Sequence, residues 1–244
     1  MGADMTVTGR SDDDASIDEV VDGDYRDADL RRAFADDDQT RTRLFRRCDF
    51  TDADLTGAVL SGATFDECVV DGAIFASAQL DESRWIRGSA SGASFLSADL
   101  TDAVLTDVDV ANTRWAGALL AGTSFTGCRL VGAQLAASRG VGLRFARCNL
   151  MLADLSGISL RNQHLEALRM DDATLSGADL RNTTWSQGRL RGATLRGAEF
   201  DGADLRDVDL GELPVTDVHR LAGAVISAAQ AAELVRQFGV IVAD

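Results

Sequence analysis

A strict five-residue period of large apolar side chains runs from Phe45 to Leu210, and it constrains this chain more than any other feature of its sequence. The period covers 34 consecutive units without an insertion or a deletion, and only Ala90 and Gly140 are small at the position concerned. A second position, two residues earlier in each unit, is mostly small. A period this long and this regular indicates a repeat architecture.

A period of five fits neither a regular helix nor a flat strand. On an α-helix with 3.6 residues per turn, five residues advance by about 500°, so the apolar side chains would spread around the whole surface. In a flat strand the side chains alternate between faces, so successive large residues would point to opposite sides. The chain must therefore turn within each unit, and stacked closed coils would keep every large side chain inside.

The cysteines indicate how many units make one coil. All four occupy the small position: Cys48, Cys68, Cys128 and Cys148. The members of each pair are four units apart, so a coil of four units places all of them in one column, and the next column is almost pure alanine. Cysteines on adjacent coils would lie within the Cα separation of a disulfide, but small reduced side chains in a core are the simpler interpretation. The two pairs lie three coils apart, which argues against a tetrahedral metal site.

Several units share residues as well as the period. Units such as Ala53-Asp54-Leu55-Thr56-Gly57 and Ala178-Asp179-Leu180-Arg181-Asn182 resemble the A-(D/N)-L-x-x consensus of pentapeptide-repeat proteins. The resemblance implies an all-β fold, a right-handed, four-sided parallel β-helix. We expect about 8.5 coils of 20 residues and a rod of roughly 40 Å at a strand spacing of about 4.8 Å. The fold constrains the function less, because proteins that share a fold carry different functional sites.

The repeat also divides the chain into segments. Residues 1–22 are acidic and aperiodic, and we expect a disordered tail. Residues 23–44 contain one good unit and are predicted to form an N-terminal cap or a partial coil. The β-helix itself should span residues 45–212.

Residues 213–244 are predicted to form a C-terminal cap. Pro214 should end the strand ladder because proline cannot donate to it. An α-helix is expected at 227–238, with a capping box formed by Ser227 and Gln230. Its apolar residues should cover the last coil or, as in some members of the resembled family, join two rods: Leu234, Val235 and Phe238. We therefore expect a monomer or an end-to-end homodimer.

Catalytic chemistry finds no support in the sequence. The carboxylates lie mainly at outward positions of a convex rod, which offers no cleft to perturb their pKa values. The two histidines, His164 and His219, have no recognisable catalytic partner, and motifs for phosphate loops, metalloproteases and nucleophile elbows are missing. We expect a protein that is not an enzyme and uses no cofactor or metal. Without a signal-peptide pattern or a transmembrane run, a cytoplasmic location and no membrane partner are predicted.

The charge is banded along the repeat. Residues 45–110 carry 12 acidic residues and 4 arginines (net −8), residues 111–170 carry 2 and 7 (net +5), and residues 171–210 carry 8 and 5 (net −3). Outward apolar residues accompany the basic band, and together they predict an interaction surface: Leu119, Val131, Val141, Met151, Leu152, Arg139, Arg144 and Arg147.

Gly140 leaves a hole in this basic band where a large residue belongs. Leu143, Ile158 and Leu168 are large residues at small positions nearby and could refill the volume, as close packing requires. A binding notch is the alternative interpretation.

Two functions of different classes follow. The first is a protein-interaction rod or scaffold with a protein partner. The second is implied by the family resemblance: some pentapeptide-repeat proteins resemble duplex DNA in size and charge, and bind the type II topoisomerase DNA gyrase, protecting it from quinolones or inhibiting it. The acidic first part fits this role, whereas the basic band interrupts the regular carboxylates that a DNA mimic should present. The negative net charge argues against direct nucleic-acid binding.

Overall fold

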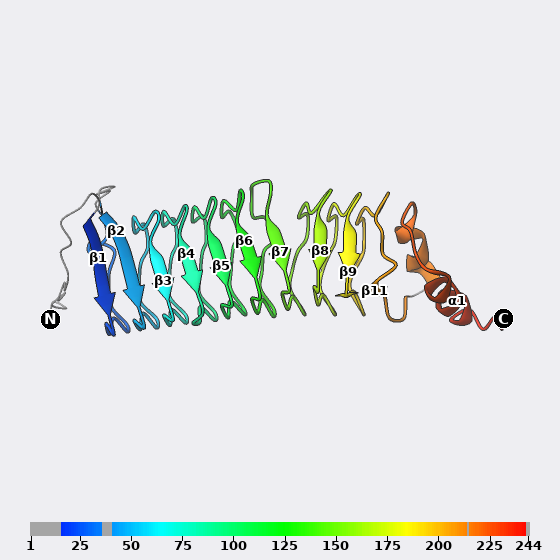
Figure 1. Cartoon of the computed structure of the whole chain (residues 1–244), viewed down its shortest axis with the longest axis horizontal. Helices are drawn as coiled ribbons and strands as arrows, with labels where there is room; N and C mark the ends of the chain where they lie inside the picture. The colour runs from blue at the N-terminus through cyan, green and yellow to red at the C-terminus, as the bar shows by residue number, and fades with distance from the viewer. Residues whose placement is uncertain (1–15, 36–40, 214, 243–244) are drawn as a thin grey trace.

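The computed structural model describes residues 16–35, 41–213 and 215–242. Within them the chain forms a parallel β-solenoid that ends in an α-helix (Figure 1). Strands β1 to β9 form one sheet in sequence order, and β10 pairs with β11 in a second. The strands are β1 (Ser16–Val21), β2 (Arg41–Arg46), β3 (Thr64–Asp66), β4 (Arg84–Ile86), β5 (Val104–Thr106), β6 (Ser124–Thr126), β7 (Arg144–Ala146), β8 (His164–Glu166), β9 (Thr184–Ser186), β10 (Gly188–Arg189) and β11 (Val208–Asp209).

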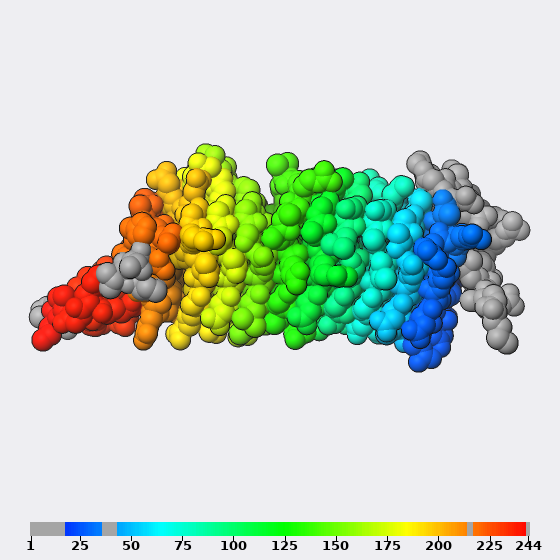
Figure 2. Space-filling model, turned by 180° about the vertical axis from the view of Figure 1, so that it is seen from behind, coloured from blue at the N-terminus to red at the C-terminus, as the bar shows by residue number. Residues whose placement is uncertain are grey.

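Successive coils pair with an offset of four units. On the side formed by the long sheet, Phe45 pairs with Phe65, which pairs with Trp85. The other three sides repeat the offset through isolated bridges: Asp49 with Val69, Asp54 with Ile74, and Val59 with Gln79. The four-sided coil of four units is confirmed. Figure 2 shows the coils packed into a rod, with an indentation in its outline between the green and the yellow-green coils.

The large residues of the period fill the interior of the rod. Aromatic rings stack from one coil to the next, with ring centroids 4.0 Å apart for Phe65 and Trp85 and 4.3 Å apart for Phe95 and Trp115. All four cysteines are buried free thiols. A hydrogen bond with Cys48, together with burial, raises the pKa of the Cys68 thiol, so this side chain is protonated and belongs to the core.

Each tryptophan carries a polar N–H into this apolar interior. In every case it donates to a hydroxyl two residues earlier, at the small position: Trp85 to Ser83 (3.0 Å), Trp115 to Thr113 (2.8 Å) and Trp185 to Thr183 (2.9 Å). The three hydroxyl residues are fully buried. These bonds remove the penalty of an unpaired buried donor.

The solenoid begins earlier than the sequence predicted. Strand β1 pairs with β2 along its whole length, with an offset of five units instead of four. The predicted tail boundary at residue 22 is therefore wrong, and the described part of the predicted cap, residues 23–35 and 41–44, belongs to the solenoid. An offset of five units leaves the five-residue period unchanged, so the period alone does not reveal the longer first coil. The predicted disorder of residues 1–15 lies outside the described residues.

The ladder also continues beyond its predicted end. Val225 pairs with Asp204, and its N–H donates to the Ala203 carbonyl (2.8 Å). The expected stop at Pro214 is therefore wrong for the ladder as a whole, although Pro214 itself lies outside the described residues. A 3-10 helix, η1 (Val215–Leu221), connects the last repeat unit to this final rung.

Helix α1 (Ala228–Arg236) closes the C-terminal end of the rod, slightly shorter than the predicted 227–238. The capping box is present: the Ser227 side chain accepts from the Gln230 N–H, and the Gln230 side chain accepts from the Ser227 N–H. The Gln230 amide also donates to the carbonyls of Leu205 (2.8 Å) and Val208 (2.7 Å). The helix thus satisfies backbone acceptors that the last coil leaves open, as a solenoid cap must.

Candidate interaction surface

The structure distributes the predicted surface over two sides of the rod. Leu119 and Arg139 are bridge partners on one side, and Val141 and Arg144 follow Arg139 around the next corner. The other four residues lie around a different side, the one with the bridged column Arg129, Asn149 and Arg169: Val131, Arg147, Met151 and Leu152. Each unit of the repeat turns the chain to a new side, so neighbours in the sequence do not form one patch.

The charge on the second of these sides is neutralised in part. Arg129 forms an ion pair with Asp109 (2.7 Å), and Arg147 forms one with Glu166 (3.2 Å). Met151 is half-buried, and its sulfur accepts from the Arg169 guanidinium (3.4 Å). Leu152 is 60% exposed and stands at a corner by itself. Two of the three arginines named on this side are therefore paired with carboxylates, and Arg169 makes no ion pair in the described structure.

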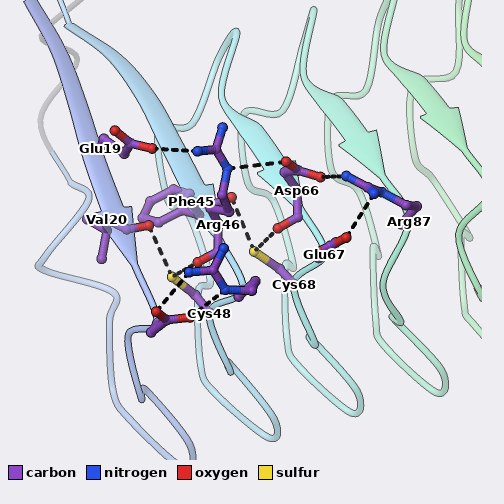
Figure 3. Close-up of polar contacts among 11 residues, drawn as sticks. Glu19, Val20, Phe45, Arg46, Cys48, Asp66, Glu67, Cys68 and Arg87 are labelled. Atoms are coloured by element: carbon purple, nitrogen blue, oxygen red, sulfur yellow. Dashed lines mark hydrogen bonds and ion pairs between the residues drawn. The ribbon is translucent and has the colours of Figure 1, made fainter.

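The N-terminal coils show the same compensation in a connected network (Figure 3). Arg46 lies between Glu19 (3.0 Å) and Asp66 (3.3 Å), and Arg87 contacts both Asp66 (2.7 Å) and Glu67 (2.8 Å). The hydrogen bond from Arg87 is the main cause that lowers the pKa of Asp66. Arg46 and Arg87 thus have carboxylate partners on adjacent coils.

Three arginines around Val141 differ from these. Arg139, Arg144 and Arg161 are exposed, and within the described residues none has a carboxylate at ion-pair distance. Arg139 and Arg144 donate only to the carbonyls of Gly117 (3.2 Å) and Gly122 (3.4 Å). Arg161, which the predicted surface does not include, lies four units beyond Val141 and therefore at the same corner of the next coil.

The strand ladder is interrupted at this corner. Leu119 bridges Arg139 and Ser159 bridges Asp179, but in the described chain no bridge joins Arg139 to Ser159. Strands β7 and β8 share a single registered pair, Ala146 with Glu166, where the neighbouring strands share three. We call this interruption the notch, formed by residues 138–142 on one coil and residues 159–164 on the next.

Gly140 explains which way the chain moves at the notch. Its φ is +121°, and a Cβ added to it would lie 2.5 Å from the Ala121 nitrogen on the preceding coil. Only glycine permits this conformation and this close approach. The segment packs against the coil before it, and the contact with the coil after it is lost. Leu143, Ile158 and Leu168 are buried, so the interior is refilled while the outer ladder remains open.

Gln163 occupies part of the opening. At other coils a backbone N–H bonds to the carbonyl at the small position of the preceding coil, as from Arg144 to Thr123 (2.9 Å). At the notch, the Leu143 carbonyl instead accepts from the side-chain amide of Gln163 (2.8 Å). The sequence signal for this feature was Gly140 at a large position, and Gln163 is a polar residue at a small position on the next coil.

The predicted C-terminal contact residues have two different environments. Leu234 is buried at 7% exposure, whereas Val235 and Phe238 are 40% and 48% exposed. Val240 and Ile241 add to this apolar surface, with 51% and 92% exposure. Leu234 therefore helps to cover the last coil, and the other residues lie free at the end of the rod.

Chemically reactive arrangements are sparse. His164 contacts the hydroxyls of Thr184 (3.0 Å) and Ser186 (3.4 Å) and no carboxylate that would orient it as a base. The described residues contain no group of three or more His, Cys, Asp or Glu side chains that could hold a metal.

A cavity of about 330 Å³ beside helix α1 is lined by residues of the last coil and the cap, among them Arg191, Asp209, Gln230 and Glu233. In the described part of the chain, no helix is long and apolar enough to cross a membrane.

The architecture defines a class: parallel β-solenoids with four-sided coils of four units and a helical C-terminal cap. The family described as pentapeptide repeats matches the sequence in eight copies, at residues 45–81, 103–139 and 173–211. With the unbroken period between these segments, this shows that the chain belongs to the pentapeptide-repeat family. Residues 140–172, which contain most of the notch, lie between two matched segments.

Solved structures show the same fold. A trypsin-treated variant of QnrB1, a plasmid-mediated fluoroquinolone resistance protein, has a TM-score of 0.61 at 21% identity, covering 94% of this chain and 100% of that one. HetL, a pentapeptide repeat protein involved in heterocyst differentiation regulation in the cyanobacterium Nostoc, has a TM-score of 0.56 at 23% identity, covering 79% and 84%. No curated protein matches the sequence. At these identities the likeness is one of fold.

Proposed function

We propose that this protein is a non-enzymatic interaction rod of the cytoplasm that binds a protein partner through the corner around Val141. The observation that carries this proposal is the group of Arg139, Arg144 and Arg161, which make no ion pair in the described structure and lie at the same corner as Val141, a valine with 83% exposure. Arginine and apolar side chains are enriched at protein interfaces. Uncompensated charge also steers a partner of opposite sign.

The arrangement of the remaining arginines supports this choice. Arg84, Arg114, Arg169 and Arg196 are also exposed without an ion pair in the described structure, but they lie on separate coils. The three arginines around Val141 lie at adjacent positions of two neighbouring coils.

Quantitative affinity capture from a lysate of the source organism tests the proposal. The bait proteins are the wild type, the triple variant Arg139→Gln/Arg144→Gln/Arg161→Gln, and the control Arg84→Gln/Arg114→Gln/Arg196→Gln, which changes the charge equally. We expect one or a few proteins to be enriched by the wild type and the control and depleted from the triple variant. Equal enrichment by all three baits would contradict a role for this corner.

A second candidate is DNA mimicry directed at DNA gyrase. The acidic body at residues 45–110, with a net charge of −8, favours it, and the adjoining basic band opposes it. A gyrase supercoiling and cleavage assay with titrated protein separates the two candidates. Absence of any effect at several-fold molar excess removes the second candidate and leaves the first.

The free C-terminal surface supports an end-to-end homodimer. Val235 and Phe238 are exposed beside the covering residue Leu234, so a second copy would bury apolar area without uncovering the last coil. Light scattering of the wild type and of Phe238→Asp tests this. We expect the wild type to have twice the mass of the variant, and equal masses would indicate that this end is not an interface.

A further inference from the structure

We propose that the notch is a docking site for an extended, carboxylate-rich segment of a partner protein, which lies along the open edge of the ladder. The inference rests on the proposed interaction function and specifies the chemistry of the partner. It combines three observations from the described structure: open backbone donors, glycines that leave these donors accessible, and arginines that make no ion pair.

The open donors follow from comparison with the neighbouring coils. The Leu120 N–H donates to the Arg139 carbonyl (2.7 Å) and the Gly122 N–H donates to the Val141 carbonyl (2.9 Å). One coil further on, the N–H groups of Gly140 and Gly142 make no corresponding bonds to Ser159 and Arg161 within the described backbone. Both glycines are exposed, and their N–H groups lie along one edge of the coil.

The N–H groups of Ser159 and His164 complete the opposite edge. Their counterparts on other coils, such as Ser124, donate to the preceding coil, in that case to the Ala103 carbonyl (2.9 Å). In the described structure Ser159 and His164 make no such bond, and the Leu143 carbonyl that His164 would have used is taken by Gln163. An extended peptide that approaches an exposed strand edge gains main-chain hydrogen bonds, the basis of recognition by strand addition.

Glycine is what makes the first edge accessible. Gly140 and Gly142 have φ values of +121° and +80° and carry no side chain to shield the amides. Between them Val141 projects into solvent with 83% exposure. A docked segment would meet two backbone donors and one apolar side chain at alternate positions, which matches the alternation of an extended chain.

The arginines select the charge of the segment. Charge-assisted hydrogen bonds from guanidinium to carboxylate are about twice as strong as neutral ones, and Arg139, Arg144 and Arg161 have this capacity unused. A duplex nucleic acid is disfavoured because acidic bands of net −8 and −3 flank the basic band, and a long polyanion would contact these as well. A short acidic peptide contacts the basic band alone.

Fluorescence anisotropy with a defined probe tests the inference. The probe is a labelled peptide of about eight residues that alternates Glu and Thr, a length chosen to cover the open edge at about 3.4 Å per residue. We expect it to bind the wild type, and to bind the Arg139→Gln/Arg144→Gln/Arg161→Gln variant at least about tenfold more weakly. The charge-matched control Arg84→Gln/Arg114→Gln/Arg196→Gln should bind as the wild type does, and a Gln/Thr peptide should not bind.

An amide map locates the bound probe. In heteronuclear NMR spectra of the full chain, the Gly140, Gly142, Ser159 and His164 amides should shift on addition of the Glu/Thr peptide. Equal binding by the two triple variants, or shifts elsewhere only, would overturn the inference. So would displacement of the peptide by duplex DNA or inorganic phosphate at lower concentrations than by unlabelled peptide. Should the peptide fail while affinity capture still depends on the three arginines, the proposed function stands and this mode of docking is overturned.

Discussion

At the scale of single residues, the interior of the rod depends on matched polar groups as well as on apolar volume. The hydroxyl beside each tryptophan shows this most clearly. Thr113 donates to the Val110 carbonyl (2.6 Å) and accepts from the Trp115 indole (2.8 Å) while it is fully buried. The five-residue period marks position 113 only as a small inward site, so it does not reveal that the hydroxyl has a partner.

Thr113→Val keeps the shape of this side chain and removes its hydroxyl. The buried indole N–H is then unpaired, and we expect the free energy of unfolding to fall by about 1–3 kcal/mol. Urea denaturation measures the change. In the double variant Thr113→Val/Trp115→Phe the unpaired indole N–H is absent. The losses in the free energy of unfolding of the two single variants should therefore not add. Strict additivity in this double-mutant cycle would contradict a direct hydroxyl–indole bond.

The Asp-x-Arg units predict how stability depends on pH. Hydrogen bonds from Arg26, Arg31 and Arg206 hold the pKa values of Asp24, Asp29 and Asp204 at about 2, below the ordinary 3.8. The folded state therefore binds fewer protons than the unfolded state between about pH 4 and pH 2, so stability falls as the pH drops through this window. Urea midpoints across a pH series should show the decline, and Asp204→Asn should reduce it. An unchanged slope in the variant would show that this carboxylate does not contribute.

At the scale of elements, the regular coils follow from the sequence and the ends do not. The four-unit register from β2 onward is fixed by the inward residues and by the cysteine column. The solenoid was predicted to start too late, with residues 23–44 as a cap or a partial coil, because residues 1–22 are acidic and because an offset of five units leaves the five-residue period unchanged. The final rung at Val225 was missed because a proline and the helix η1 separate it from the repeat.

The notch gave a partial signal in the sequence. Gly140 stood out against the period, and buried neighbours refill the interior while the outer ladder opens. Which side of the rod would open, and that Arg161 would be there, required the three-dimensional register. Five consecutive residues span one side and one corner, so residues that are close in the sequence belong to different sides.

Hydrogen exchange tests the interruption of the ladder directly. We expect the amides of Gly140, Gly142, Ser159 and His164 to exchange faster than those of Leu120, Gly122 and Arg144, because backbone groups without a ladder partner are open to water. Exchange followed by NMR at neutral pH resolves the individual positions. Equal protection in the two sets would mean that the ladder is continuous in solution.

The C-terminal cap depends strongly on one side chain. Gln230 completes the capping box and donates to the Leu205 and Val208 carbonyls. Gln230→Ala removes all of these side-chain bonds, and we expect a loss of about 1–3 kcal/mol from the cap, as for a cap residue with buried partners. Circular dichroism and urea denaturation measure it. The neighbouring change Ala231→Ser, which leaves these bonds intact, is the control, and an equal loss in both variants would contradict the assignment.

At the scale of the whole molecule, the rod combines a regular interior with an irregular surface. Each coil rests mainly on its neighbours, so the architecture tolerates one interrupted contact without losing the core. Charge compensation fails at the same corner where the ladder opens, and an exposed valine lies between the arginines. This coincidence distinguishes one site on an otherwise repetitive molecule, and it is the basis for proposing a role in binding.

Site-specific photo-crosslinking in cells tests that role most directly. A benzoylphenylalanine residue replaces Val141 in one variant and Ile74, which is 40% exposed on another side of an N-terminal coil, in the other. We expect ultraviolet light to join the Val141 variant to a discrete protein partner, and the adduct to disappear when Arg139, Arg144 and Arg161 are changed to Gln. The Ile74 variant should give no adduct. The same adduct from both positions, or none from position 141, would contradict a binding role for this corner.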